Sequence, residues 1–184
     1  MTRLQALNPE TTTGKTKELF NTVQSKLGMV PNMMRTMGNS YAVLNGYLSF
    51  SGALGESKIG SRLGELIALA VAEANQCEYC LSAHTVIGGK LLGIDEETIY
   101  SSRTTKTADA RVNAALTFAQ TLVRKKGLVS DSDVAAVRDA GFTEGEIAEI
   151  IAHTALNIFT NYFNHIANTV IDFPKVSLLA EQVA

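Results

Sequence analysis

Two cysteines and a histidine lie close together in the segment CEYCLSAH, where Cys77 and Cys80 are the only cysteines of the chain. His84 follows four residues after the second cysteine. Such a group can bind a metal, form a structural disulfide or act as a redox-active dithiol. If the segment is helical, Cys77, Cys80 and His84 project from one face, because residues three and four apart are neighbours. His84 would then be placed to take a proton from Cys80, one turn away.

The number of candidate ligands argues against zinc. Structural zinc usually has four ligands arranged as two separated pairs, but the chain has no second cysteine pair, and His153 and His165 are isolated from this one. The N-terminal segment lacks the apolar core of a signal peptide, so we expect a cytoplasmic protein, in which lasting disulfides are rare. Two inert cysteines in a helical core are a further alternative. A redox-active pair is the interpretation that we favour.

Glu65 adds a carboxylate to this group. The segments on either side of Asn75 and Gln76 both have helical periodicity, so we expect them to fold back on each other as a hairpin. Glu65 lies ten residues before Asn75 and His84 nine residues after it. At about 1.5 Å per residue, both lie roughly 14 Å from the turn. A carboxylate at that depth would orient the imidazole of His84 and raise its basicity.

Two arguments disagree about which thiol ionises more readily. Cys77 lies near the expected helix start, after the plausible cap Asn75, where unpaired N–H groups and the helix dipole favour an anion. Cys80 lies one turn from His84, which is a specific base. We favour Cys80, because a directional base is the closer influence.

Helical periodicity predominates along the rest of the chain, and strand alternation is hard to find. The length of 184 residues and the 46% content of hydrophobic residues fit one globular domain with a sizeable core. We therefore predict a single all-α domain over residues 1–184, with roughly eight or nine helices. The helical segment 142–171 is long for a single helix, and we expect it to kink or break near Asn157.

The second half of the chain repeats part of the first. The spacing of Glu65 and His84 recurs in Glu146 and His165, and Asn161 takes the position of Cys80. A duplicated helical hairpin is therefore an open alternative, and the sequence does not assign roles to Glu146, Asn161 and His165.

Asparagines recur at helical spacing in the same segment, at Asn157, Asn161, Asn164 and Asn168. A polar stripe is usually a solvated face, but in a segment this apolar it can instead line a pocket or a subunit contact.

Charge and hydropathy exclude two classes of partner. The net charge is −2 and the sixteen basic residues are scattered, whereas binding to a phosphate backbone needs a concentrated basic face. The longest apolar-rich run, LIALAVAEANQC, is broken by Glu73 and Asn75 and is too short to span a bilayer. We expect no nucleic acid and no membrane as partners.

The pattern E-x(11)-C-x-x-C-x-x-x-H, formed by Glu65, Cys77, Cys80 and His84, resembles the active-site motif of AhpD-like alkylhydroperoxidases in the carboxymuconolactone decarboxylase superfamily. The segments GMVPNMMRTM, LGELIALAVAEANQCEYCLSAH and NIFTNYFNHIANTVIDFP resemble the peroxidase-related branch of that superfamily, so the resemblance covers about residues 28–174. It implies an all-helical homo-oligomer built from helical hairpins, and a peroxidase cycle without haem, flavin or metal.

Carried over residue by residue, the resemblance implies that Cys80 attacks the hydroperoxide and that Cys77 resolves the product as a disulfide. Glu65 and His84 match the proton relay. A dithiol reductant, or a lipoyl group on an adaptor protein, would reopen the disulfide. Tyr79 departs from the prototype, which has a histidine directly before the second cysteine, and this departure leaves the rate and the reductant open.

Two other functions stay open. The first is a redox-responsive interaction protein with little turnover. The second is a decarboxylase-type enzyme that uses Glu65 and His84 as acid–base groups, although the decarboxylase branch generally lacks the CxxC.

Overall fold

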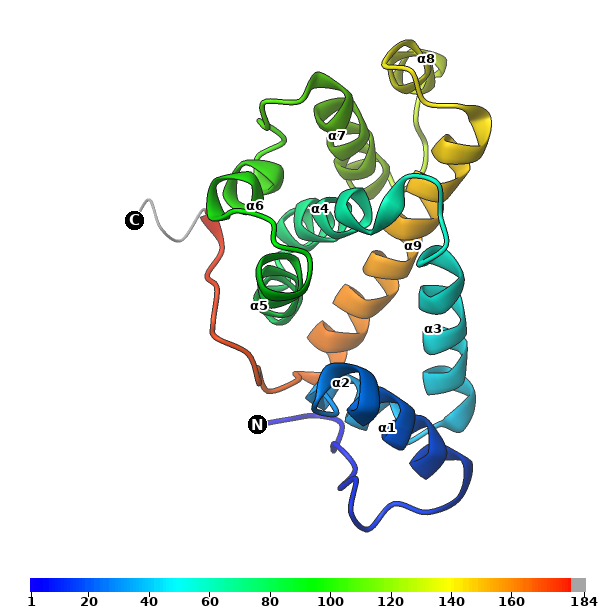
Figure 1. Ribbon diagram of the computed structural model, residues 1–184, viewed down its shortest axis with the longest axis vertical. Helices are drawn as coiled ribbons and strands as arrows, with labels where there is room; N and C mark the ends of the chain where they lie inside the picture. Colours follow the sequence, from blue (N-terminus) through cyan, green and yellow to red (C-terminus); the bar gives the residue numbers. More distant parts are fainter. Residues whose placement is uncertain (180–184) are drawn as a thin grey trace.

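The computed structural model describes residues 1–179, and every regular element in that range is helical (Figure 1). Nine α-helices and one π-helical segment follow in chain order: α1 (Gly14–Leu27), α2 (Asn32–Met37), α3 (Tyr41–Leu54), α4 (Gly60–Ala74), α5 (Glu78–Val86), η1 (Ile87–Leu91), α6 (Glu96–Arg103), α7 (Ala110–Arg124), α8 (Asp131–Asp139) and α9 (Glu144–Ala167). The predicted all-α fold is confirmed.

Helix α4 is the centre of the bundle and packs against α5, α6, α7 and α9 (Figure 1). Its sequence, GSRLGELIALAVAEA, is apolar around most of the helix, and nine of its fifteen residues are buried. A helix that is hydrophobic on nearly all sides belongs in the interior, because only there are all its faces covered. The central position of α4 therefore follows from its composition.

Helices α4 and α5 form the predicted hairpin. The turn depends on Gln76, whose φ of 58° reverses the chain. Asn75 is the C-cap of α4, and Cys77 is the N-cap of α5. The prediction that Asn75 caps α5 is therefore wrong: the sulfur of Cys77 takes that role and accepts the backbone N–H of Cys80 at 3.3 Å.

Helix α9 is continuous from Glu144 to Ala167, so the predicted break near Asn157 is wrong. The side-chain amide of Asn157 donates to the carbonyl of His153 in the same helix, at 2.9 Å, and so does not compete with the helical backbone. The chain turns only at Asn168, whose φ is 49°. Because α9 does not fold back on itself, the second half of the chain does not form a duplicated hairpin.

The segment after α9 runs back along α5 and α6 (Figure 1). The backbone N–H of Val176 donates to Ser82 in α5 at 2.9 Å. Arg103 of α6 donates to the carbonyl of Ser177 and forms a buried ion pair with Glu73 of α4 at 2.7 Å. None of the helices within residues 1–179 is both long and apolar enough to cross a membrane.

Candidate active site

Cys77 and Cys80 form a disulfide at the start of α5. Their Cα atoms are 5.3 Å apart, and each residue is only 2% exposed. This arrangement brings together the two cysteines that the sequence analysis singled out. Within residues 1–179, no group of three or more His, Cys, Asp or Glu side chains is placed to hold a metal ion.

His84 lies one turn after Cys80 on α5 and pairs with Glu65 of α4. Its Nδ1 lies 2.8 and 3.0 Å from the two carboxylate oxygens, and the side chains of His84 and Glu65 are 23% and 11% exposed. Burial of the ring works against its charge, but the charge of Glu65, its hydrogen bond and the nearby Asn157 side chain raise the pKa of His84 above its usual value. The hairpin thus brings together the carboxylate and imidazole expected from their equal depth.

Tyr47 of α3 is a further polar group near this pair. Burial, followed by the charge of Glu65, raises its pKa to about 12, against a smaller opposite effect of a hydrogen bond with Ser51. Its phenol therefore stays protonated at neutral pH and keeps a donor near the carboxylate. Nothing in the local sequence connects Tyr47 with Glu65, since the two lie on different helices.

The asparagines of α9 face the hairpin rather than solvent. Asn157, Asn161 and Asn164 are buried, and Asn168 is exposed at the end of the helix. Asn161 accepts a hydrogen bond from the amide of Asn75 at 2.9 Å. Asn164 donates to the sulfur of Cys80 at 3.3 Å. Asn164 was not among the site residues predicted from the sequence, although the polar stripe in an apolar segment was a signal that pointed to it.

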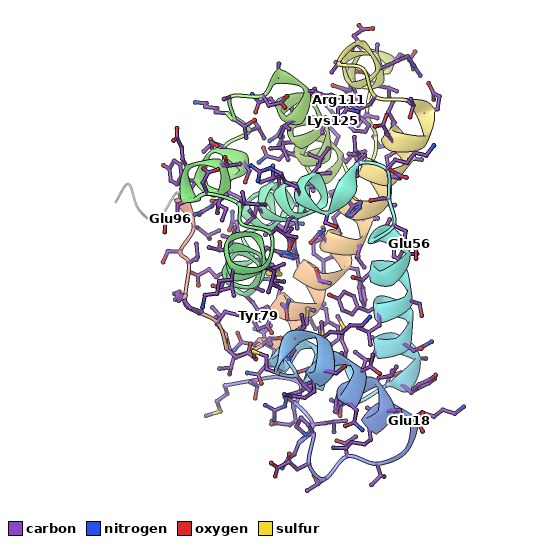
Figure 2. The ribbon with its side chains drawn as sticks, viewed as in Figure 1. Glu18, Glu56, Tyr79, Glu96, Arg111 and Lys125 are labelled. Carbon is purple, nitrogen blue, oxygen red and sulfur yellow. A yellow bond between two sulfur atoms is a disulfide. The ribbon has the colours of Figure 1, made fainter. Side chains whose placement is uncertain are left out.

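Tyr79 does not replace the function of a histidine at the sulfur. Its hydroxyl accepts the backbone N–H of Met33 in α2 at 3.1 Å, and its ring packs edge-on against Phe173 with centroids 5.8 Å apart. Figure 2 shows Tyr79 at the end of α5 that faces α2. Burial, which opposes ionisation, raises its pKa well above the usual value. Tyr79 therefore holds α2 and the C-terminal segment against the dithiol helix.

The second Glu and His of the sequence repeat do not form a second pair. Glu146 accepts the backbone N–H of Thr143 at the start of α9 and pairs with Arg111 at 2.7 Å. His165 is exposed, and its Nε2 lies 2.9 Å from the carbonyl of Asn75. Both residues stabilise local structure.

A shallow depression of about 190 Å³ opens beside the disulfide. Cys77, Tyr79 and Asn164 line it together with Asn168. Pockets that enclose drug-sized ligands are larger, typically about 300–1,000 Å³. The depression is therefore of a size for a small reactant or for the end of a longer one.

One protein family matches part of the chain. Residues 41–123, which contain Glu65, Cys77, Cys80 and His84, match the carboxymuconolactone decarboxylase family. No curated protein sequence is significantly similar to the chain.

Solved structures match nearly the whole chain. An uncharacterised peroxidase-related protein from Silicibacter sp. TM1040 is 28% identical, with 92% of this chain and 94% of that chain covered and a TM-score of 0.79. An uncharacterised peroxidase-related protein from Ralstonia eutropha JMP134, described as an alkylhydroperoxidase AhpD core, is 23% identical, with 93% and 92% covered and a TM-score of 0.83.

A third similar structure is the debrominase Bmp8, which is 20% identical, with 94% and 93% covered and a TM-score of 0.79. A cysteine-to-alanine variant of Bmp8 has been solved in complex with 2,3,4-tribromopyrrole. At this identity the likeness concerns the fold. A segment of the chain thus matches the carboxymuconolactone decarboxylase family, and nearly the whole chain shares its fold with peroxidase-related proteins, one of them described as an alkylhydroperoxidase AhpD core.

Proposed function

We propose that the protein is a thiol-dependent peroxidase that reduces organic hydroperoxides through a Cys77–Cys80 dithiol–disulfide cycle. The observation that carries the proposal is a cysteine pair at disulfide distance, one helical turn from His84, whose imidazole is paired with Glu65. A thiol that attacks, a thiol that resolves and a group that moves protons are the requirements of such a cycle.

In the first step, the Cys80 thiolate attacks the terminal oxygen of the hydroperoxide. The S–O bond forms as the O–O bond breaks, so sulfur is oxidised by two electrons and the alkoxide leaves with the O–O bonding pair. The alkoxide takes a proton from the His84 imidazolium and becomes an alcohol. The raised pKa of His84 supports this role, because it favours the protonated ring at neutral pH.

In the second step, Cys77 attacks the sulfenic acid sulfur of Cys80. The S–S bond forms, the S–O bond breaks and water leaves, its second proton coming from the Cys77 thiol by way of His84. A dithiol reductant must then reduce the disulfide, and we propose a small dithiol or a lipoyl-type adaptor protein for this step. A reducing compartment such as the cytoplasm suits this requirement.

The outer face of α9 supports a homo-oligomer. Large apolar side chains recur along it at helical spacing and are 42–65% exposed: Ile151, Phe159, Tyr162 and Ile166. An apolar stripe of this kind on a soluble helix is typical of a contact between subunits. We expect Tyr162→Lys to lower the molar mass measured by light scattering, and an unchanged mass would contradict this contact.

The experiment that tests the peroxidase is hydroperoxide consumption with dihydrolipoamide as reductant. Cys80→Ser should abolish turnover. In the absence of reductant, prereduced Cys77→Ser should consume about one equivalent and then stop at the Cys80 sulfenic acid, since Cys80 can still be oxidised but has no resolving thiol. If both variants turn over like the wild type, the cysteines are dispensable and the proposal fails. That result would favour acid–base chemistry at Glu65 and His84.

A second candidate is reductive debromination, favoured by the likeness to Bmp8. In that reaction the aromatic carbon gains hydrogen and bromine leaves as bromide, while the Cys77 and Cys80 thiols supply two electrons and become a disulfide. Incubation of the reduced protein with 2,3,4-tribromopyrrole tests it. Stoichiometric bromide release would support this candidate, and its absence under conditions of active peroxide turnover would exclude it.

A further inference from the structure

Asn164 is the side chain of α9 that reaches the reactive sulfur. It is 5% exposed. Its amide nitrogen lies 3.3 Å from the sulfur of Cys80 and 3.3 Å from the thioether sulfur of Met33. A primary amide has two N–H donors, so both are directed at sulfur atoms.

The contact with Met33 determines which way the amide points. A thioether has no hydrogen to donate, so it can only accept. Rotating the amide of Asn164 by half a turn would direct its oxygen at two sulfur acceptors and leave its NH₂ group without those partners. The nitrogen therefore faces Cys80 in the structure, and the same orientation suits a Cys80 thiolate, which can only accept.

The same orientation leaves the amide oxygen of Asn164 buried without a hydrogen-bond partner in the part of the chain that the structure describes. Unpaired buried acceptors are uncommon in folded proteins, and each one needs an explanation. Asn164 also lines the depression beside the disulfide, together with Cys77 and Tyr79. The free acceptor thus belongs to a residue that touches both the reactive sulfur and the route to it.

We propose that Asn164 is a catalytic residue that donates a hydrogen bond to the Cys80 thiolate and accepts the O–H of the hydroperoxide with its unpaired oxygen. The inference rests on the proposed peroxidase function. A hydrogen bond to a thiolate is charge-assisted and stronger than one to a neutral sulfur, so the contact favours the ionised form of Cys80.

The second contact orients the substrate. The hydroperoxide proton stays on the attacked oxygen and becomes the hydroxyl proton of the sulfenic acid, so Asn164 neither gains nor loses a proton. The alkoxide leaves and is protonated by His84. Because the donor and acceptor belong to one planar amide, they hold the thiolate and the attacked oxygen side by side.

The donor role is tested in the Cys77→Ser background, where Cys80 is the only thiol and Ser is a favourable N-cap for α5. The rate of alkylation by iodoacetamide across pH gives the thiolate fraction. Asn164→Leu should lower that fraction at neutral pH about ten-fold or more, as expected for the loss of one hydrogen bond to a charged group. Asn164→Asp should lower it further, because a carboxylate repels the thiolate.

The acceptor role is tested by comparing two oxidants that differ in their ability to donate. Cumene hydroperoxide has an O–H, and methyl methanethiosulfonate has no donor. Both rates are corrected for the thiolate fraction. Asn164→Leu should then react about ten-fold more slowly than the parent protein with cumene hydroperoxide, but at the same rate with methyl methanethiosulfonate. Asn164→Asp keeps an acceptor oxygen and should retain most of the corrected hydroperoxide rate.

Thr154→Val is the matched control, since Thr154 is buried on the same helix and donates only to the carbonyl of Ile150. It should leave the alkylation profile unchanged. If Asn164→Leu fails to fold, the similarly shaped Asn164→Asp carries the donor test, and Asn164→Ala, which has no acceptor, carries the acceptor test.

The results separate this inference from the function on which it rests. An unchanged alkylation profile in folded Asn164 variants overturns the donor role. Equal slowing with both oxidants overturns the acceptor role. If the wild type is not oxidised by the hydroperoxide but the alkylation profile of the variants still shifts, the peroxidase proposal fails and the donor contact stands.

Discussion

Replacing Glu65 with Gln removes the negative charge beside His84 and keeps the shape of the side chain. The carboxylate oxygens lie 2.8 and 3.0 Å from the ring nitrogen. Only 11% of the Glu65 side chain and 23% of the His84 side chain are exposed, so water screens the pair weakly. The variant therefore isolates the contribution of the charge to holding His84 protonated in the folded protein.

The expected loss of stability follows from the contribution of a hydrogen bond to a charged group, which is about 1.5–3 kcal/mol of the free energy of unfolding. We expect Glu65→Gln to lower the free energy of unfolding by about 2 kcal/mol at about pH 5.5, where His84 is protonated. For a protein of this length, that loss corresponds to a fall in Tm of about 4–8 °C.

The pH dependence has a definite sign. The pKa of His84 in the folded protein is raised above its ordinary value of 6.5, so the stabilisation is fully present below pH 6.5 and is lost as the pH rises through the pKa of the folded protein. The difference in stability between wild type and Glu65→Gln should therefore be largest near about pH 5.5 and shrink as the pH rises through the raised pKa of His84.

Urea denaturation at several pH values, with the disulfide kept intact throughout, measures this difference. Glu146→Gln is the control, because Glu146 pairs with Arg111 and not with a histidine, and its own pKa is lowered by hydrogen bonds with Thr143. The ionised Glu146 stabilises the folded protein at every pH above the pKa that Glu146 has in the unfolded chain. The loss of stability in Glu146→Gln should therefore stay constant from about pH 5.5 upward. A Glu65→Gln penalty that is constant or grows with pH would refute the reasoning.

Three further predictions concern stability. In Gly64→Ala the new Cβ would lie 2.7 Å from the ring of His153, so we expect the free energy of unfolding to fall by about 1–3 kcal/mol. In Gly46→Ala the new Cβ meets no atom within 4 Å, and the free energy of unfolding should rise by about 0.5–1 kcal/mol. Thermal unfolding of both variants checks this, and equal effects would contradict it. Under reducing conditions, Cys77→Ser should be more stable than Cys77→Ala by about 1 kcal/mol, because serine can cap α5; equal urea midpoints would show that the cap is unimportant. Tyr79→Phe leaves a buried N–H of α2 without its acceptor and should cost about 1–3 kcal/mol in urea denaturation, and a variant as stable as the wild type would disprove the anchoring role.

The part of the site that the sequence predicts is the part that local geometry determines. Glu65 and His84 lie at similar distances from one turn, and the rise per residue of a helix then places them at similar depth. The apolar composition of α4 likewise indicates its central position. Both inferences need only the spacing within one hairpin, which is why they could be made without a tertiary structure.

Other features depend on single backbone angles or on contacts between distant segments. The left-handed conformation of Gln76 decides that Cys77 caps α5 instead of lying inside it, and a single angle of this kind has no periodic signature. Asn164 contacts Cys80 across 84 residues of sequence. The asparagine spacing could indicate that these amides share a face, but the packing of α9 against α5 decides which sulfur they reach.

The two sulfurs consequently have different surroundings, and the difference bears on how the disulfide is reopened. Cys77 lines the depression, whereas Cys80 is the sulfur that receives the side-chain hydrogen bond of Asn164. Thiol–disulfide exchange is favoured when the attacked sulfur is accessible and the other leaves as a stabilised thiolate. A reductant that attacks Cys77 therefore releases Cys80 in its ionised form. In the proposed cycle, reduction through the depression would return the enzyme directly to the state that reacts with the next hydroperoxide.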